Sequence, residues 1–487
     1  MARATGKRRW LSATVAALTA GITALTPAVA SGAQVTRAPA NGAHHGRTAD
    51  LGAVVAHRLA GRAYPALRAF QRIADRNGGT RGYDQPGFAA SADYVVHRLR
   101  QAHYRVWRQK VPYTDFVPDE ERAVERSPVQ RSYRLLMTRW VPSTPRGGIT
   151  ARVGVLPEGA SGCTASDYAG FAGAIAVVPR GTCGYTAQQA LAAQAGAVAF
   201  IVYYPTPSPD NAYRFIAFTP SDFTIPMGSI SQREGEELIA QARARTVMLT
   251  VVLRAHEEQR VTENVLAETA GGRPDSVVMV GGHLDSVTEG PGINDNASTA
   301  SAVLQTALAL APYQRKVVNK VRFAWWGAEE LVDIGSDYYV AHLSAEERRH
   351  VRALVNGELL GSPNYVRHVW DGGPAGGHAI AARFEQFFDA RGLPYEVVDP
   401  ALVGSDHEPF EAVGIPIGGL DSGLLSVKTE AEQQVFGGRA GQLEDPCYHQ
   451  ACDRISNIDR SVLDADTQAL GYVVGSLAVD ATGLPTR

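Results

Sequence analysis

The stretch SVVMVGGHLDSV, residues 276–287, decides the fold. Val277 to Val280 form an unbroken apolar run, which is typical of a strand buried on both faces of a parallel sheet. Two glycines then lead into His283 and Asp285, which share a side of the chain if the backbone stays extended. Such a pair suits one metal ligand and a carboxylate that accepts from its imidazole, although a lone His-x-Asp is more often a surface hydrogen bond.

Helices and strands alternate around this stretch. An amphipathic helix is expected over 298–311 and strands over 264–268 and 320–325, while helices are expected over 66–77 and 90–102. A further strand is expected over 104–111, ending at Pro112. This alternation predicts a three-layer α/β domain, with a mostly parallel mixed sheet between helices. Ligand sites in such sheets lie at the carboxyl ends of the strands, where His283 lies.

Four more segments carry candidate metal ligands or catalytic groups. They are GINDNAS (292–298) with Asp295, WGAEE (326–330) with Glu329 and Glu330, LVNGE (354–358) with Glu358, and CYHQAC (447–452) with His449. Each has a structural alternative, such as a helix cap for Asp295 or a solvated helix start for the glutamate pair. Packing gains nothing from two adjacent carboxylates, whereas one binding a cation and the other moving a proton explains both.

The first thirty residues have the three parts of a secretory signal peptide. A basic start is followed by an apolar stretch over 11–24 and a small-residue cleavage site over 27–30. A membrane anchor is the alternative, but the apolar stretch is short. Residues 31–55 are predicted to be a disordered leader or pro-segment. We therefore expect a secreted, extracellular protein.

The charge balance excludes two classes of partner. The 487 residues carry 47 Lys and Arg against 49 Asp and Glu, a net charge of −2. The sequence has no basic block beyond its N-terminus, which argues against nucleic-acid binding. Past residue 30 there is no apolar run long enough to span a bilayer, so no membrane association is expected.

The sequence has four cysteines, Cys163, Cys183, Cys447 and Cys452. An even count in an exported chain predicts two disulfides. Of the three possible pairings, Cys163–Cys183 and Cys447–Cys452 are the simplest because each closes a short loop. A cysteine-based zinc site is the alternative, and no CxxC pair supports it.

The pattern of expected strands and helices changes between 145 and 254. Apolar strands are expected over 173–178 and 197–204, with an Ala/Gln-rich helix over 186–195 between them. The pattern of a strand, Arg-Gly-x-Cys, a helix and a Gly-Ala-x-Ala strand resembles the protease-associated (PA) domain, a small β-rich insertion of secreted and vacuolar peptidases. The motif Ser405-Asp406-His407 lacks a GxSxG nucleophile elbow, so we interpret it as a structural loop rather than a serine-hydrolase site.

Outside this insertion, the motifs and their order along the chain resemble those of the secreted bacterial aminopeptidases with a two-zinc site. The likeness covers about 55–130 and 255–480, and also includes GSPN (361–364) and SDHEPF (405–410). It implies that Asp295 bridges two zinc ions, with His283 and Glu358 on one ion and Glu330 and His449 on the other.

The resemblance also implies roles in catalysis. Glu329 would take a proton from water and deliver it to the leaving amine, and Tyr448 would donate to the oxyanion. Asp285 would orient His283. The substrates implied are peptides with a free N-terminus.

Two departures from the family's pattern affect these expectations. The family usually has Asp at the place of Glu358, and the longer side chain is expected to hold its zinc less tightly. Leucine-preferring members have an aromatic residue at Asp421 and Arg at Gly404, which are the candidate substrate-binding positions. Asp421 is therefore expected either to point to solvent or to favour an N-terminal Lys or Arg.

We therefore expect a secreted zinc-dependent aminopeptidase. Its predicted parts are a signal peptide (1–30), a leader (31–55), peptidase segments (56–144 and 255–487) and the PA insertion (145–254). One alternative is a glutaminyl cyclase on the same fold with a single zinc. The other is a PA-containing binding protein that has lost catalysis, which the five plausible zinc donors disfavour.

Overall fold

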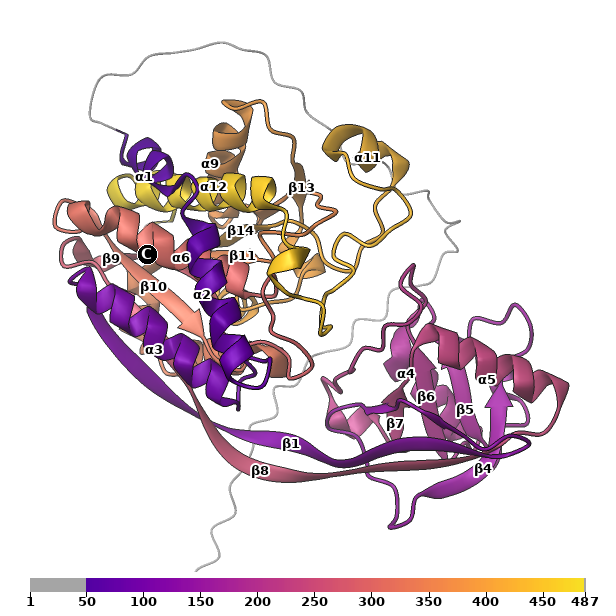
Figure 1. The fold of residues 1–487 in the computed structure, drawn as a ribbon. Coiled ribbons are helices and arrows are strands. Elements are labelled where there is room, and N and C mark those ends of the chain that lie inside the picture. The colour runs from indigo at the N-terminus through magenta and orange to yellow at the C-terminus, as the bar shows by residue number, and fades with distance from the viewer. Residues whose placement is uncertain (1–49, 486–487) are drawn as a thin grey trace, which may run out of the picture. The chain divides into compact units, whose positions relative to one another are not determined.

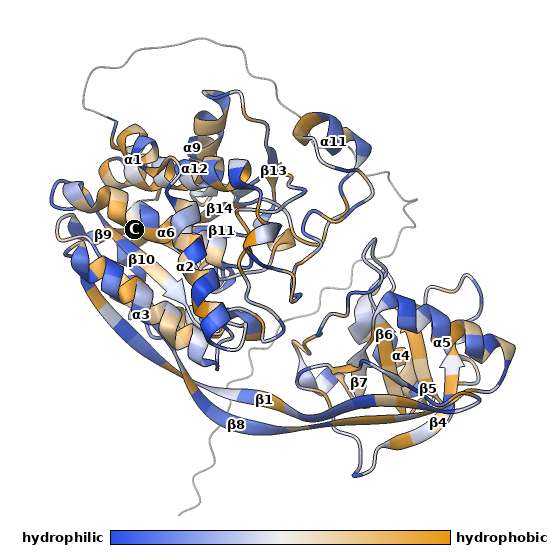
Figure 2. Cartoon of the chain, viewed as in Figure 1, coloured by the Kyte–Doolittle hydropathy of each residue, from blue (hydrophilic) through white to orange (hydrophobic). Residues whose placement is uncertain are grey.

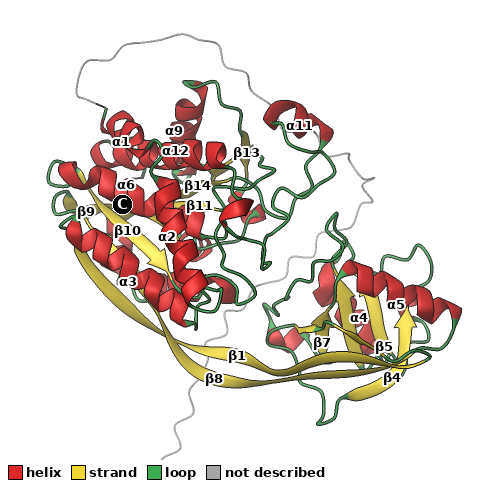
Figure 3. Cartoon of the chain, in the orientation of Figure 1, coloured by secondary structure: helices red, strands yellow, loops and turns green. Residues whose placement is uncertain are grey.

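The computed structural model describes residues 50–485, and the predicted signal peptide and most of the predicted leader lie outside this range. The central sheet of the peptidase domain has the order β13-β12-β14-β11-β9-β10-β8 (Figures 1 and 3). Strands β14, β11, β9 and β10 are parallel, while β12 and β8 run antiparallel to their neighbours β14 and β10. The strands are β8 (Met248–Glu268), β9 (Arg273–His283), β10 (Asn319–Trp326), β11 (Val351–Glu358), β12 (His368–Asp371), β13 (Glu396–Val398) and β14 (Ile417–Asp421).

Helices cover both faces of this sheet. One face packs on α1 (Leu51–Leu59), α2 (Ala63–Arg76), α3 (Pro86–Gln101), α6 (Ala297–Leu310), α9 (Gly377–Asp389) and α12 (Arg460–Val479). The other face packs on α7 (Ile334–Ala341) and α10 (Glu408–Ala412), with α8 (Ala345–His350) close by and α11 (Glu430–Phe436) further along the chain. Val278 and Val280 of β9 enter the first core, and Val277 and Met279 enter the second. This two-sided burial explains the unbroken apolar run in the sequence, and it confirms the predicted fold class.

The first and last helices of the peptidase domain lie side by side, at very short range. A methyl group placed on Gly52 of α1 would lie 2.2 Å from Ser476 Oγ, and one on Gly471 of α12 would lie 2.1 Å from Leu59 Cδ1. Only glycine therefore permits this approach of α1 and α12. Residues 51–55, predicted as the end of the leader, form the first part of α1, and the predicted boundary at residue 55 is wrong because Leu51 and Val55 are buried there.

The PA domain has its own sheet and core. Its strands are β4 (Ile149–Val155), β5 (Ile175–Pro179), β6 (Ala199–Tyr203), β7 (Met227–Ser229) and β3 (Leu136–Met137), and its helices are α4 (Gly184–Gln194) and α5 (Gln232–Ala244). Strands β5 and β6 consist mostly of hydrophobic residues (Figure 2). The core also takes in Tyr133, Leu135 and Met137. Residues before the predicted start of the insertion at 145, including β3, therefore pack into the same core.

Two long strands lead into and out of the PA domain. β1 (Arg105–Ser127) pairs antiparallel with β8 along almost its whole length, from Arg105 opposite Glu268 to Ser127 opposite Met248. The prediction that a strand ends at Pro112 is wrong. On its other side β1 pairs, among the described strands, only with β2 (Arg131–Tyr133), at 123–125, so Pro112 lies in an edge strand, where proline is tolerated.

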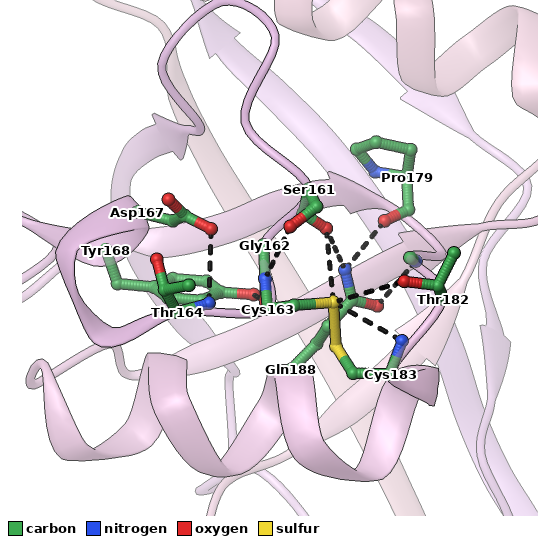
Figure 4. The surroundings of a disulfide bond; sticks show 11 residues. Ser161, Gly162, Cys163, Thr164, Asp167, Tyr168, Pro179, Thr182, Cys183 and Gln188 are labelled. Carbon is green, nitrogen blue, oxygen red and sulfur yellow. Dashed lines mark hydrogen bonds between the residues drawn. A yellow bond between two sulfur atoms is a disulfide. The ribbon is translucent and has the colours of Figure 1, made fainter. Parts of the chain in front are cut away.

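The two predicted disulfides, Cys163–Cys183 and Cys447–Cys452, are both present. The first joins the loop before the PA domain's 3₁₀ turn to the start of α4 (Figure 4). Beside it the buried Gln188 donates to the carbonyls of Ser161 and Pro179. This bond network anchors the Arg-Gly-x-Cys loop. Among the described residues no helix combines the length and the apolar character needed to cross a membrane.

Candidate active site

Five segments bring their polar side chains together at the carboxyl ends of the central strands. His283 and Glu358 are the last residues of β9 and β11, and Glu330 lies in the 3₁₀ turn that follows β10. Asp295 lies two residues before α6, and His449 lies between the half-cystines Cys447 and Cys452. The parallel arrangement of β9, β10 and β11 places three of these groups at one edge, as the sequence predicts.

Asp295 lies at the centre of the cluster. Its Oδ1 is 3.2 Å from His283 Nε2, and its Oδ2 is 3.1 Å from His449 Nε2. His283 Nε2 is also 3.2 Å from Glu358 Oε1, and His449 Nε2 is 3.0 Å from Glu330 Oε2. Two groups of donor atoms result, each within 4.8 Å: His283, Asp295 and Glu358, and Asp295, Glu330 and His449. Each could hold a metal ion, and Asp295 belongs to both.

Buried carboxylates hold the segment around Asp295. The backbone N–H groups of Asn294 and Asp295 donate to the carboxylate of Asp453, at 2.8 and 3.0 Å. Asn294 Nδ2 donates to Asp445, which also accepts from the N–H of Cys447. Asp445 therefore ties the segment of Asp295 to the disulfide loop that carries His449. No sequence pattern singles out Asp453 or Asp445 for this role.

Glu358 is fixed by two side chains. Its Oε2 accepts from Ser405 Oγ at 2.8 Å and from Asn296 Nδ2 at 3.0 Å, which leaves Oε1 facing His283. Burial raises the pKa of Glu358 to about 7. Ser405 thus supports a candidate ligand, consistent with a structural loop at 405–407.

Asp285 positions the pair Glu329 and Glu330. Its two carboxylate oxygens accept from the backbone N–H groups of Glu329 and Glu330 at 3.2 and 3.3 Å. Its Oδ1 is 3.7 Å from His283 Nδ1, which is longer than a hydrogen bond. The expected contact between Asp285 and the His283 imidazole is therefore not made in this structure, and the carboxylate orients the glutamate backbone instead.

The donor set fits metal ions in N/O coordination. Glu330 Oε1 is buried and lacks a hydrogen-bond partner in the described part of the chain. Burial raises the pKa of Glu329 well above its usual range, and the nearby carboxylates of Asp333 and Glu358 add to this effect. Unpaired buried carboxylate oxygens are costly, and divalent cations would satisfy them.

Non-glycine residues with strained, positive-φ backbone conformations are concentrated around the same cluster. Of the seven non-glycine residues with positive φ in the described range, five flank or belong to the cluster: Ala328, Val332, Asp333, Leu359 and His449. Val332 has φ +70° and is β-branched, so this conformation is unfavourable. Such strain is commonly stored at functional sites, where the surrounding structure imposes it.

A cavity of about 330 Å³ opens beside the cluster. Glu329, Glu330, Tyr448 and His449 line it, together with Gly404 and residues of the PA-domain loop. The rings of Tyr448 and His449 stack, with centroids 3.9 Å apart. Tyr448 therefore lies where a hydroxyl could reach a molecule bound in the cavity. Gly404, a predicted substrate-binding position, also faces this cavity.

Asp421 is the last residue of β14 and lines a second cavity, of about 430 Å³, which shares Val403, Leu425 and Tyr448 with the first. It is fully buried and accepts from His368 Nδ1 at 2.8 Å and Trp370 Nε1 at 2.6 Å. The nearby carboxylate holds the pKa of His368 at about 9 against the opposing effect of burial. The prediction that Asp421 points to solvent is wrong, and its charge is met by a histidine of the protein itself. No sequence pattern indicates this pairing, because His368 and Asp421 lie on different strands that are far apart along the chain.

This fold and this site define a metallopeptidase. The model of "Peptidase family M28" matches residues 264–474, and that of the "PA domain" matches 149–238. The chain is 37% identical over 434 residues to an aminopeptidase of Pseudomonas aeruginosa, covering 85% of this chain and 80% of that protein. It is 36% identical to leucine aminopeptidase 2 of Trichophyton rubrum, covering 71% and 70%. The chain belongs to peptidase family M28 and carries an inserted PA domain.

Solved structures share the fold. A zinc aminopeptidase of Bacillus subtilis aligns with a TM-score of 0.67 at 22% identity, covering 87% of this chain and 97% of that one. A peptidase M28 precursor of Shewanella amazonensis aligns with a TM-score of 0.68 at 19% identity, covering 90% and 98%. The predicted family, the PA domain and the prediction of a peptide-hydrolysing enzyme are confirmed.

Proposed function

We propose that this protein is a secreted zinc-dependent aminopeptidase that uses two zinc ions per chain. The observation that carries the proposal is the shared carboxylate of Asp295, which offers one oxygen to each of two histidine-containing donor sets. A single-zinc glutaminyl cyclase would need only one such set. The curated relatives named as aminopeptidases support the substrate class, peptides with a free N-terminus.

His283 and Glu358 would hold one ion and Glu330 and His449 the other, with Asp295 between them. When bound, the ions would polarise the scissile carbonyl and acidify a water. Glu329 lines the cavity without belonging to either donor set, and its side chain is 16% exposed. Its carboxylate accepts the proton of the attacking water and passes it to the leaving amine. The Tyr448 hydroxyl donates to the carbonyl oxygen as charge develops there.

Secretion is supported by the signal-peptide pattern of the sequence and by the two disulfides, which persist in oxidising compartments. Sequencing the N-terminus of the protein recovered from culture medium tests this part. A start at Ser31 or later is expected.

The activity is tested with aminoacyl 4-nitroanilides, before and after chelation and with zinc restored, alongside metal analysis. Two zinc ions per chain and loss of turnover on chelation are expected. Glu329→Gln is expected to retain both ions and the fold while turnover falls about 10²–10⁴-fold, the usual loss for a general base. Near wild-type turnover in Glu329→Gln would falsify the assignment of the base. One zinc per chain, with cyclisation of an N-terminal Gln peptide, would favour the cyclase.

A further inference from the structure

The active-site cavity extends beyond the groups that the proposed mechanism uses. Besides Glu329 and His449, its lining includes Val403, Gly404, Glu408 and Leu425. Two further carboxylates of the lining, Asp333 and Glu408, belong to neither metal-donor group. The cavity therefore combines apolar wall residues with two additional acidic groups beside the proposed site of bond cleavage.

Gly404 leaves space for a ligand in this part of the cavity wall. It has φ +63°, a backbone conformation that favours glycine. A methyl group placed on Gly404 would lie 3.4 Å from Glu408 Oε1. The Glu408 carboxylate thus lies just over the glycine, and any larger residue at 404 would compete for the space next to it.

Asp333 supplies an independent sign that a cation belongs here. Its residue is only 7% exposed, and its Oδ1 is buried without a hydrogen-bond partner in residues 50–485. Burial, reinforced by the charge of Glu408, raises the pKa of Asp333 to about 7. An unpaired buried carboxylate is costly unless a positive charge approaches it.

The protein does not provide that charge from the cavity wall. Apart from His449, the cationic side chain in the described lining is Arg214 of the PA-domain loop. Arg214 is already paired with Glu121 and, at 3.2 Å, with Glu289. No ion pair of Asp333 or Glu408 is found in the described part of the chain. Among the described residues, neither Asp333 nor Glu408 is therefore paired with a cationic side chain of the cavity wall.

We propose that Val403, Gly404, Leu425 and Glu408, with Asp333, form the subsite for the N-terminal side chain, and that it selects lysine or arginine. The inference rests on the proposed aminopeptidase function. The methylene stem of such a side chain packs along Val403 and Leu425 while its charged end reaches Glu408. This places specificity at Glu408 rather than at the internally paired Asp421.

Norleucine and lysine substrates provide the test, because norleucine has the same stem without the ammonium group. We expect wild-type kcat/KM to favour lysyl over norleucyl 4-nitroanilide by about fivefold, the upper end of the range for an exposed ion pair. Glu408→Gln is expected to lower this ratio at least threefold, chiefly through the KM of the lysyl substrate. Asp333→Asn is expected to lower it as well.

Glu411→Gln is the matched control, because Glu411 lies on the same helix α10, is exposed and does not line the cavity. Its lysine-to-norleucine ratio should equal that of the wild type. A wild-type ratio of one or less, or an unchanged ratio in Glu408→Gln, overturns the subsite while norleucine turnover still upholds the aminopeptidase. No turnover of any aminoacyl substrate refutes the proposed function and this inference with it.

Discussion

Replacing Glu358 by aspartate tests whether this site is built around the longer side chain. The carboxylate would retract by about 1.5 Å, the length of one carbon–carbon bond. Its contacts with Ser405 Oγ and Asn296 Nδ2, now 2.8 and 3.0 Å, would lengthen to about 4.3–4.5 Å if the backbone stays in place. Neither would then be a hydrogen bond.

The loss of one partner that orients a metal ligand typically costs about 10–100-fold in metal affinity, so losing both predicts about 10²–10⁴-fold. Chelator competition followed by metal analysis measures this. Glu358→Asp should release one of the two proposed zinc ions at far lower chelator concentration than the wild type. Ser405→Ala, which removes one donor and keeps the reach of Glu358, should fall between the two.

From these two hydrogen bonds we predict the opposite sign to that expected from the sequence. Comparison with the family's aspartate suggested that the extra methylene weakens zinc binding, because a further rotatable bond must be immobilised. Ser405 and Asn296 already immobilise it. If Glu358→Asp holds zinc as tightly as the wild type or more tightly, the argument from these two hydrogen bonds is refuted.

Two further predictions concern the surroundings of the site. Replacing Cys447 and Cys452 by serine should lower zinc retention without lowering the unfolding temperature of the PA domain, because the disulfide loop holds His449 at φ +58°. A variant with the same zinc content as the wild type would contradict this. His368 has a folded pKa of about 9, above its unfolded value, so its pairing with Asp421 stabilises the fold fully below about pH 6.5 and is lost as pH rises through 9. The difference in unfolding free energy between wild type and His368→Gln should therefore shrink from pH 6 to pH 10, and a difference independent of pH would exclude a charged His368.

The sequence predicts the parts of this molecule that rest on local patterns. The run Val277–Val280 follows from burial on two faces, and His283 follows it at the strand end. The candidate ligands lie in five separate segments, yet each stands beside a strand or helix end, so the topology of a parallel sheet is enough to gather them.

What the sequence does not predict depends on contacts between distant segments. Ser405 reaches Glu358 across 47 positions, and Asp453 reaches Asp295 across 158. Neither partner has a spacing that would reveal it. Pro112 is a local signal for the end of a strand, but the edge position of β1 allows the strand to continue through it. The pairing of Asp421 with His368 arises only from the register of β12 and β14.

The tight contact between α1 and α12 has a consequence for biosynthesis. Glycines at 52 and 471 let these helices approach closely, although about 400 positions separate them along the chain. During translation α1 emerges long before its permanent neighbour exists, so the peptidase domain can close only after the polypeptide is released. The PA domain is continuous in sequence and can fold while the ribosome is still at work. The N-terminal helices are thus the segment most prone to aggregate before folding is complete. We expect a chaperone to bind this segment preferentially.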